Sequence, residues 1–243
     1  MLVPRPERDR LRAVILDVDG TLYNQQYVCM RMLLRLPSSV ARTPVHGFSV
    51  VRALRAFRRG EFMRRETANE GITVPLAARQ IELAAQRSDL SVEFVREVTD
   101  SWMNRSPLDL VARARRPGVV EFLTLARSVG IRIGICSDYP ADAKLTAMEL
   151  GSYVDTVVSA QDASVGRFKP NPRGIQVAFA NLGVPADQAM YVGDQQDVDA
   201  PAGRAVGVYT VILTNFLDLR TEYLGHRSPY AAAHAGQLGA GPG

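Results

Sequence analysis

Residues 13–21 read Ala-Val-Ile-Leu-Asp-Val-Asp-Gly-Thr and join an apolar run to two carboxylates. The four apolar residues 13–16 are typical of a strand that is buried on both faces of a parallel sheet. Asp17 and Asp19 follow directly, and in an extended segment residues two apart project to the same face. Two carboxylates held so close repel each other unless a cation or a shared proton compensates their charge. The stretch therefore predicts a charged site at the end of a central strand, although Asp-Gly is also a common dipeptide of exposed turns.

The composition is that of a globular protein with a sizeable core. The chain has 243 residues, of which 47% are hydrophobic, and a net charge of +4. Its two cysteines, Cys29 and Cys136, fit neither a metal-binding spacing nor a disulfide framework. Lysine is rare, since all basic residues except Lys144 and Lys169 are arginine. There is no apolar run of signal-peptide or membrane-spanning length, so we expect a soluble, cytoplasmic protein without a membrane partner.

The apolar periodicity divides the chain into two kinds of region. After the first strand at 13–16 it is helical over residues 24–111, with helices expected at 27–34, 50–57, 75–84 and 92–102 and no further strand there. Strands are then expected at 131–136, 154–159, 190–192 and 208–213, alternating with helices at 117–130, 141–150, 172–182 and 199–206. Such alternation implies a parallel sheet with helices on both faces. We expect an α/β core from residues 1–23 and 112–224, an inserted all-helical domain over 24–111, and a mobile tail over 225–243.

Chemically active residue types follow four of the expected strands. Ligands of open parallel sheets bind outside the carboxyl ends of the strands, so these residues should converge on one edge. The four groups are Asp17 and Asp19, then Ser137 and Asp138, then a loop with Lys169, and finally Gly193-Asp194. Carboxylates suit a hard cation, for which Mg²⁺ is the best candidate, and a hydroxyl with an ammonium group suits phosphate oxygens. The set predicts a phosphoryl-transfer site.

Together these motifs resemble those of the haloacid dehalogenase (HAD) superfamily of aspartate-nucleophile phosphotransferases. They occur in order as Asp17-Val-Asp19-Gly-Thr, Ser137, Lys169-Pro-Asn-Pro and Gly193-Asp194 with a further acid, and the resemblance covers essentially the whole chain apart from the tail. The helical insertion is similar to the C1 cap of phosphoglycolate phosphatase-like and β-phosphoglucomutase-like members. The resemblance implies a Rossmann-like core and a Mg²⁺-dependent phosphatase that hydrolyses a small phosphorylated metabolite, a phosphate monoester.

The resemblance also implies roles for single residues. Asp17 would be the nucleophile that forms an aspartyl-phosphate, and Asp19 would protonate the leaving group and then activate water. Asp17, Asp194 and the backbone carbonyl of Asp19 would hold Mg²⁺. Ser137 and Lys169 would bind the phosphoryl oxygens. The phosphate-binding set implied by the motifs also includes Gly20, Thr21 and Asp138.

One position departs from the commonest family pattern, and a second motif leaves two candidate residues. Asp138 stands where the family usually has Asn. It either binds the water shell of the metal, or discourages acidic substrates, or is an exposed turn residue whose backbone N–H matters more than its side chain. The further acid of the fourth motif is either Asp197 or Asp199. The family spacing to a following glycine, here Gly207, favours Asp199, which would act through metal-bound waters or Lys169.

Several other functions are weighed against the phosphatase. A phosphomutase of the same superfamily shares all four motifs, and a non-catalytic HAD-like binding or regulatory protein is disfavoured because the motifs are intact. Asp19 argues against a haloacid dehalogenase, and the lack of lysine in residues 24–111 argues against a phosphonatase. The arginines of residues 31–65 either contact a second anionic group or form solvated helix faces. No basic patch with interleaved aromatic residues predicts a nucleic-acid partner, and the oligomeric state stays open.

Overall fold

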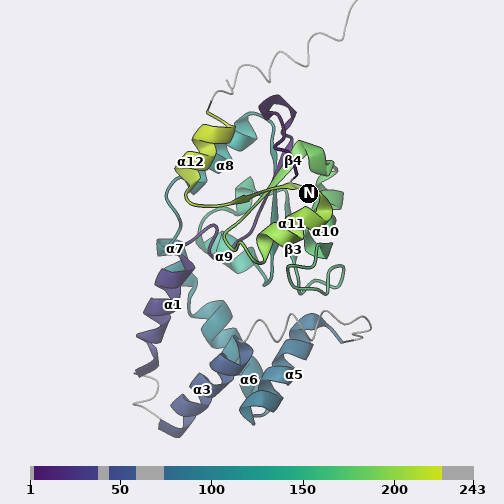
Figure 1. Ribbon diagram of the computed structural model, residues 1–243. Coiled ribbons are helices and arrows are strands. Elements are labelled where there is room, and N and C mark those ends of the chain that lie inside the picture. The colour runs from purple at the N-terminus through teal and green to yellow at the C-terminus, as the bar shows by residue number, and fades with distance from the viewer. Residues whose placement is uncertain (1–2, 38–43, 59–73, 226–243) are drawn as a thin grey trace, which may run out of the picture.

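The computed structural model describes residues 3–37, 44–58 and 74–225 (Figure 1). Its centre is a five-stranded parallel sheet with the strand order β3-β2-β1-β4-β5. The strands are β1 (Ala13–Leu16), β2 (Arg132–Ser137), β3 (Thr156–Ser159), β4 (Ala189–Gly193) and β5 (Tyr209–Ile212). The expected α/β fold with a parallel sheet is confirmed, and the strand that carries the first motif lies in its middle.

Helices cover both faces of the sheet. The helices that follow β1 in the core are α8 (Val119–Ser128), α9 (Asp142–Ala147), α10 (Arg173–Leu182), α11 (Asp199–Val206) and α12 (Phe216–Tyr223). In Figure 1, α8 and α12 lie on one side of the sheet, and α10 and α11 lie on the other. Single-turn helices complete the connections at η1 (Arg8–Arg10), η3 (Gly151–Tyr153) and η4 (Ala186–Gln188).

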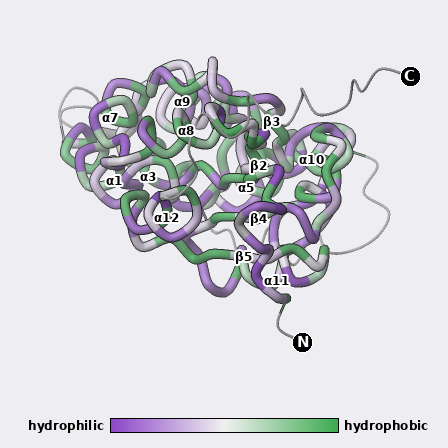
Figure 2. Tube along the Cα trace, turned by 90° about the horizontal axis from the view of Figure 1, so that it is seen from above, coloured by the Kyte–Doolittle hydropathy of each residue, from purple (hydrophilic) through white to green (hydrophobic). Residues whose placement is uncertain are grey.

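The central strand β1 shows why both faces are apolar. Val14 and Leu16 pack in a cluster with Phe122 of α8 and residues of α12, whereas Ala13 and Ile15 pack in a second cluster with residues of α10 and α11. Successive side chains of a strand point to opposite faces, so an uninterrupted apolar run is required where both faces are covered. All four residues are fully buried. Along the helices, hydrophilic and hydrophobic stretches alternate, as expected for elements with one buried and one exposed side (Figure 2).

A helical segment lies between β1 and α8. Its elements are α1 (Gln25–Leu33), α3 (Pro44–Phe57), α5 (Leu76–Ser88), α6 (Val92–Thr99), the π-helical turn η2 (Asp100–Arg105) and α7 (Leu108–Arg113). Four of them, α1, α3, α5 and α6, lie away from the sheet in the lower part of Figure 1. Val50, Phe57, Ile81 and Val95 belong to a third hydrophobic cluster that α3, α5 and α6 share. This cluster is separate from the two clusters of the sheet.

The structure differs from the sequence-based expectation in three elements. The helix expected over 92–102 is α-helical only to Thr99 and then continues as the π-helical turn η2. Helix α7 spans the expected boundary at residue 111, and its Leu110 and Val111 pack in a cluster of the sheet. Helix α12 was not expected, although Phe216, Leu219 and Tyr223 give it a buried face. The expected mobile tail lies outside the described residues except for Gly225. None of the described helices has the length and apolarity needed to cross a membrane.

Candidate active site

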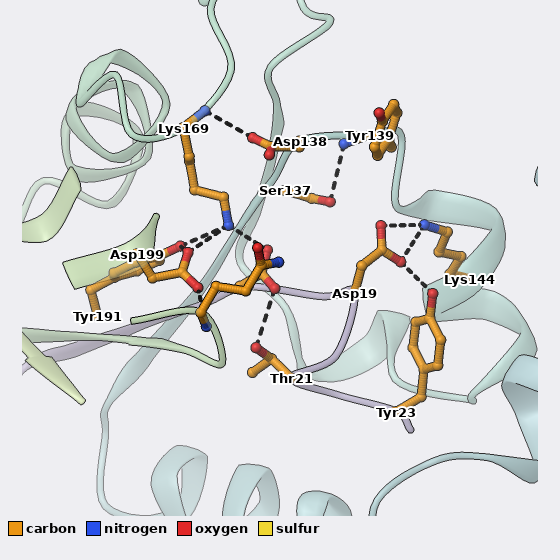
Figure 3. A network of polar contacts seen from close by, with 12 residues as sticks. Asp19, Thr21, Tyr23, Ser137, Asp138, Tyr139, Lys144, Lys169, Tyr191 and Asp199 are labelled. Atoms are coloured by element: carbon orange, nitrogen blue, oxygen red, sulfur yellow. Dashed lines mark hydrogen bonds and ion pairs between the residues drawn. The ribbon is translucent and has the colours of Figure 1, made fainter. Parts of the chain in front are cut away.

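The loops after β1, β2, β3 and β4 meet at the carboxyl edge of the sheet (Figure 3). Lys169 is at the centre of this meeting point. Its Nζ donates hydrogen bonds to Asp17 Oδ1 at 2.6 Å, Asp199 Oδ1 at 2.7 Å and the hydroxyl of Tyr191 at 3.0 Å. The Tyr191 hydroxyl in turn donates to Asp199 Oδ1 at 2.7 Å. Asp17 is 3% exposed and Lys169 5%, so this network is shielded from water and its charges are poorly screened.

Burial and the neighbouring charges shift the pKa values in this network. Burial, reinforced by the charge of Asp199, raises the pKa of Asp17 to about 7 against the opposing effect of Lys169. Burial would also raise the pKa of Asp199, but the Lys169 ammonium and the Tyr191 hydroxyl hold it below its usual value. Burial disfavours the charged form of Lys169, yet the surrounding acids raise its pKa well above the ordinary value. One ammonium group is therefore shared between two carboxylates, and Asp17 is the less well compensated of them.

The third acid of the cluster is Asp194, at the end of β4. Oxygen atoms of Asp17, Asp194 and Asp199 lie within 4.8 Å of one another. Asp194 Oδ1 is buried and accepts no hydrogen bond from the described residues, and burial followed by the charge of Asp199 raises the pKa of Asp194. Buried polar atoms are nearly always paired, and three carboxylates exceed the charge of one ammonium. The residues present therefore fit a hard divalent cation such as Mg²⁺.

Two glycines allow the loops to approach this closely. Gly20 has a φ of +97°, and a Cβ atom there would lie 2.0 Å from Asp194 Oδ2. A Cβ atom at Gly193 would lie 2.3 Å from the carboxyl group of Asp199. The Gly20 carbonyl accepts hydrogen bonds from Arg116 Nε at 3.0 Å and Nη2 at 2.8 Å. The first and fourth motifs are therefore in close contact at Gly20, and the hydrogen bonds from Arg116 hold the Gly20 backbone in place.

Asp19 is not part of the Lys169 network. Both of its carboxylate oxygens accept hydrogen bonds from Lys144 Nζ, at 2.5 and 2.8 Å, and Oδ1 also accepts one from the hydroxyl of Tyr23 (Figure 3). Burial alone would raise the pKa of Asp19, but the Lys144 ammonium and the Tyr23 hydroxyl outweigh it and lower the pKa. Lys144 belongs to α9, so this helix fixes the orientation of the second carboxylate of the first motif.

The remaining residues expected in the phosphate-binding set lie in the same loops. Thr21 Oγ1 donates to Asp17 Oδ2 at 3.2 Å, and Ser137 Oγ accepts a hydrogen bond from the backbone N–H of Tyr139 at 3.3 Å. Asp138 Oδ1 accepts a hydrogen bond from the backbone N–H of Lys169 at 3.0 Å. Asp138 thus connects the second loop to the third, a role that none of the sequence-based alternatives contained.

The two candidate acids of the fourth motif have different surroundings. Asp199 is the first residue of α11 and is 0% exposed, and its Oδ2 accepts a hydrogen bond from the backbone N–H of Gln195 at 2.9 Å. Asp197 is exposed. The geometry therefore favours Asp199 as the acid that acts through Lys169.

Sequence reasoning missed Tyr23, Lys144, Tyr191 and Arg116 as site residues. Two signals could have found some of them. Lys144 is one of only two lysines in the chain. Tyr191 stands in an otherwise apolar strand, and a buried tyrosine hydroxyl needs a hydrogen-bond partner.

The arginines of the helical segment have mixed surroundings. Arg35 donates to the Ser106 carbonyl at 2.6 Å and forms an ion pair with Asp109 at 2.7 Å. Arg52 donates to the backbone carbonyls at the end of α5, Ser88 and Asp89. These two arginines therefore stabilise the helical segment. Arg42, Arg59, Arg64 and Arg65 lie outside the described residues.

The chain is similar to known proteins both in sequence and in fold. The chain is 31% identical over 112 residues to a phosphoglycolate phosphatase of Rhodospirillum rubrum, a match that spans 45% of each protein. It is 25% identical over 214 residues to a phosphoglycolate phosphatase of Pseudomonas savastanoi pv. phaseolicola, covering 84% of this chain and 69% of the relative. In fold it resembles a β-phosphoglucomutase of Clostridium difficile, with a TM-score of 0.56, 16% identity, and coverage of 92% of this chain and 96% of that one.

A family model also matches most of the sequence. The model is described as haloacid dehalogenase-like hydrolase and covers residues 11–207, from the segment before β1 to the end of α11. All four motifs at the sheet edge lie within this range. The chain therefore belongs to the haloacid dehalogenase-like hydrolase family.

Proposed function

We propose that the protein is a Mg²⁺-dependent phosphatase that hydrolyses a phosphate monoester through an aspartyl-phosphate on Asp17. The observation that carries the proposal is the contact of Lys169 with Asp17 Oδ1 beside the buried, unpaired oxygen of Asp194. A carboxylate and a phosphate anion repel each other. Attack of one on the other therefore needs cations beside the oxygen atoms of both groups. The phosphatase names of the sequence relatives support the same reaction class.

Each residue then has a distinct task. Asp17 attacks phosphorus, the bond from phosphorus to the alcohol oxygen breaks, and Asp19 gives its proton to the leaving oxygen. Asp19 next takes a proton from water, which attacks the aspartyl-phosphate, releases inorganic phosphate and restores Asp17. Lys169 and Ser137 bind the phosphoryl oxygens. Mg²⁺ held by Asp17, Asp194 and the Asp19 carbonyl would offset the repulsion between the anions, and Asp199 would orient Lys169.

The acid role of Asp19 sets a condition on the substrate complex. In the free protein Lys144 favours the ionised carboxylate of Asp19. For Asp19 to act as an acid, the anionic substrate bound beside it must raise the pKa of Asp19. The substrate must also bring the proton that Asp19 later gives to the leaving group.

The proposal is tested by phosphate release from p-nitrophenyl phosphate, with the chain freed of metal by EDTA and then given MgCl₂. We expect release only with Mg²⁺, and we expect Mg²⁺ to raise the temperature of thermal unfolding as a ligand of the native state. Asp194→Asn should lose both effects. Asp197→Asn is the matched control. Asp197 is exposed and lies three residues after Asp194, so this variant removes an equal charge and should keep both the Mg²⁺-dependent release and the Mg²⁺-dependent rise in unfolding temperature. Release that is equal in EDTA, or an unaltered response of Asp194→Asn to Mg²⁺, would contradict the metal assignment.

A further inference from the structure

A cavity of about 820 Å³ opens from the catalytic carboxylates toward the helical segment. Asp17, Asp19 and Lys169 line one end of it. The opposite wall comes from α1, α3 and the residues around η2. The cavity is thus continuous with the position at which a phosphoryl group would meet Asp17, and it extends in the direction in which the rest of a substrate would lie.

The wall away from the carboxylates is mainly apolar. Its side chains include those of Met32, Leu33, Leu54, Phe57, Trp102 and Met103. Charged side chains of the helical segment also line the cavity, namely Arg55, Arg58, Arg96 and Asp100. Their net charge is positive, which complements the charge of an incoming phosphate. Phe57 is also a buried member of the third hydrophobic cluster, so the core of the helical segment supports this wall.

The size of the cavity exceeds what a short phosphorylated acid requires. Volumes of roughly 300–1,000 Å³ accommodate drug-sized ligands. A phosphoryl group with a two-carbon acid would leave most of the apolar wall in contact with water. Leu33 is 56% exposed at this wall in the free protein, and removing such surface from water is favourable.

Building on the phosphatase function above, we propose that this cavity is a subsite for the alcohol part of the substrate and that the substrates are phosphate monoesters of large, mainly apolar alcohols. Two of the sequence relatives are named for phosphoglycolate. The glycolate part of that molecule is short and acidic, so it differs from the proposed alcohols in size and in charge. The phosphoryl group occupies the sheet edge, and the alcohol lies against α1 and α3.

A series of n-alkyl phosphates from ethyl to octyl tests the subsite, because the basicity of the leaving alkoxide is nearly constant along it. We expect kcat/KM to rise about fourfold per added methylene until the cavity is filled. We also expect hexyl phosphate to be a better substrate than 2-phosphoglycolate by about tenfold or more.

Two neighbouring leucines at the C-terminal end of α1 provide a matched pair of variants. Leu33 lines the cavity, whereas Leu34 follows it directly, is 64% exposed and is not among the lining residues. Both side chains are exposed, so replacing either by Gln should leave thermal unfolding unchanged. Leu33→Gln should lower kcat/KM for octyl phosphate by about tenfold and for ethyl phosphate by less than about twofold. Leu34→Gln should retain the full dependence on chain length.

The outcomes separate this inference from the function on which it is built. Phosphate release that is independent of chain length, or that is fastest with 2-phosphoglycolate, would overturn the apolar subsite and leave the phosphatase intact. Equal effects of Leu33→Gln and Leu34→Gln would overturn the assignment of this cavity as the subsite. Absence of release from every ester, including p-nitrophenyl phosphate, would refute the phosphatase function and the inference with it.

Discussion

The sheet edge and the helical segment use their polar residues in opposite ways. At the sheet edge Asp17, Lys169, Tyr191 and Asp199 are buried and bonded to one another, so their positions depend on the whole network. In the helical segment Arg52 and Arg35 bind backbone carbonyls, and the wall that faces the site is mainly apolar. A preorganised polar network suits the stabilisation of charge, whereas an apolar wall suits the selection of a leaving group by its shape and size. Substitutions at the edge should therefore affect the reaction itself, and substitutions in the segment should affect stability or substrate choice.

The largest effect is expected for Asp17→Asn. Loss of the nucleophile should reduce turnover on the order of 10³-fold or more with every ester. Because burial raises the pKa of Asp17 to about 7, the fold disfavours its charged form, and the neutral amide should not lower the temperature of thermal unfolding. Asp197→Asn serves as the control and should be fully active. Turnover that survives in Asp17→Asn would contradict the claim that the sheet edge, and not the helical segment, carries out the reaction.

The next effect concerns the close contact between the first and fourth motifs. A methyl group at Gly20 would displace the Asp194 carboxylate, and a misplacement of about 1 Å costs roughly 10²-fold in rate. Gly20→Ala should therefore lose about 10²-fold in kcat and bind Mg²⁺ more weakly, as measured by calorimetric titration. Gly130→Ala is the control, because Gly130 also has a positive φ of +77° but no atom within 4 Å of the added carbon. Equal activity of the two variants would contradict the close-contact account.

A smaller and more selective effect is expected for Lys144→Met. Without the ammonium group the Asp19 carboxylate keeps only its hydrogen bond from Tyr23, so it is less firmly oriented and proton transfer to the leaving oxygen should slow. We expect about a tenfold loss with an alkyl phosphate and less than about a twofold loss with p-nitrophenyl phosphate, whose leaving group needs no proton. Lys144→Arg retains the cation and should recover part of the rate. A loss of the same size with both esters would show that Lys144 does not act through Asp19.

The smallest effect is expected for Arg52→Ala in the helical segment. Loss of its hydrogen bonds to the carbonyls at the end of α5 should lower the free energy of unfolding by about 1 kcal/mol, as measured by urea denaturation. Its kcat and KM values should equal those of the unchanged chain. A raised KM without loss of stability would instead indicate that Arg52 contacts the substrate.

The same comparison explains how much the sequence could predict. At the sheet edge, residues that follow parallel strands must converge, so Asp17, Lys169 and Asp194 could be located without a structure. Lys144 and Tyr23 could not be located in this way, because their contact with Asp19 depends on how α9 packs beside the first loop. The contact of Asp138 with the Lys169 backbone likewise joins two loops whose conformations the motifs do not specify.

In the helical segment the periodicity predicted helices but not their arrangement. No residue pattern indicated that α6 would continue as the π-helical turn η2, which brings Trp102 and Met103 to the cavity. The buried face of α12, formed by Phe216, Leu219 and Tyr223, has helical spacing and was readable in principle. Cavity size depends on the packing of several helices, so the substrate class could not be derived from sequence periodicity.

The most direct measurement is the capture of the covalent intermediate. The chain is mixed with Mg²⁺ and a rapidly hydrolysed ester, quenched in acid within the first turnover, digested, and analysed by mass spectrometry. We predict a phosphoryl group on the peptide that contains residues 13–21, assigned to Asp17 by fragmentation and absent from Asp17→Asn. Steady turnover without any phosphorylated peptide, or with the group on a different residue, would contradict the assignment of Asp17 as the nucleophile.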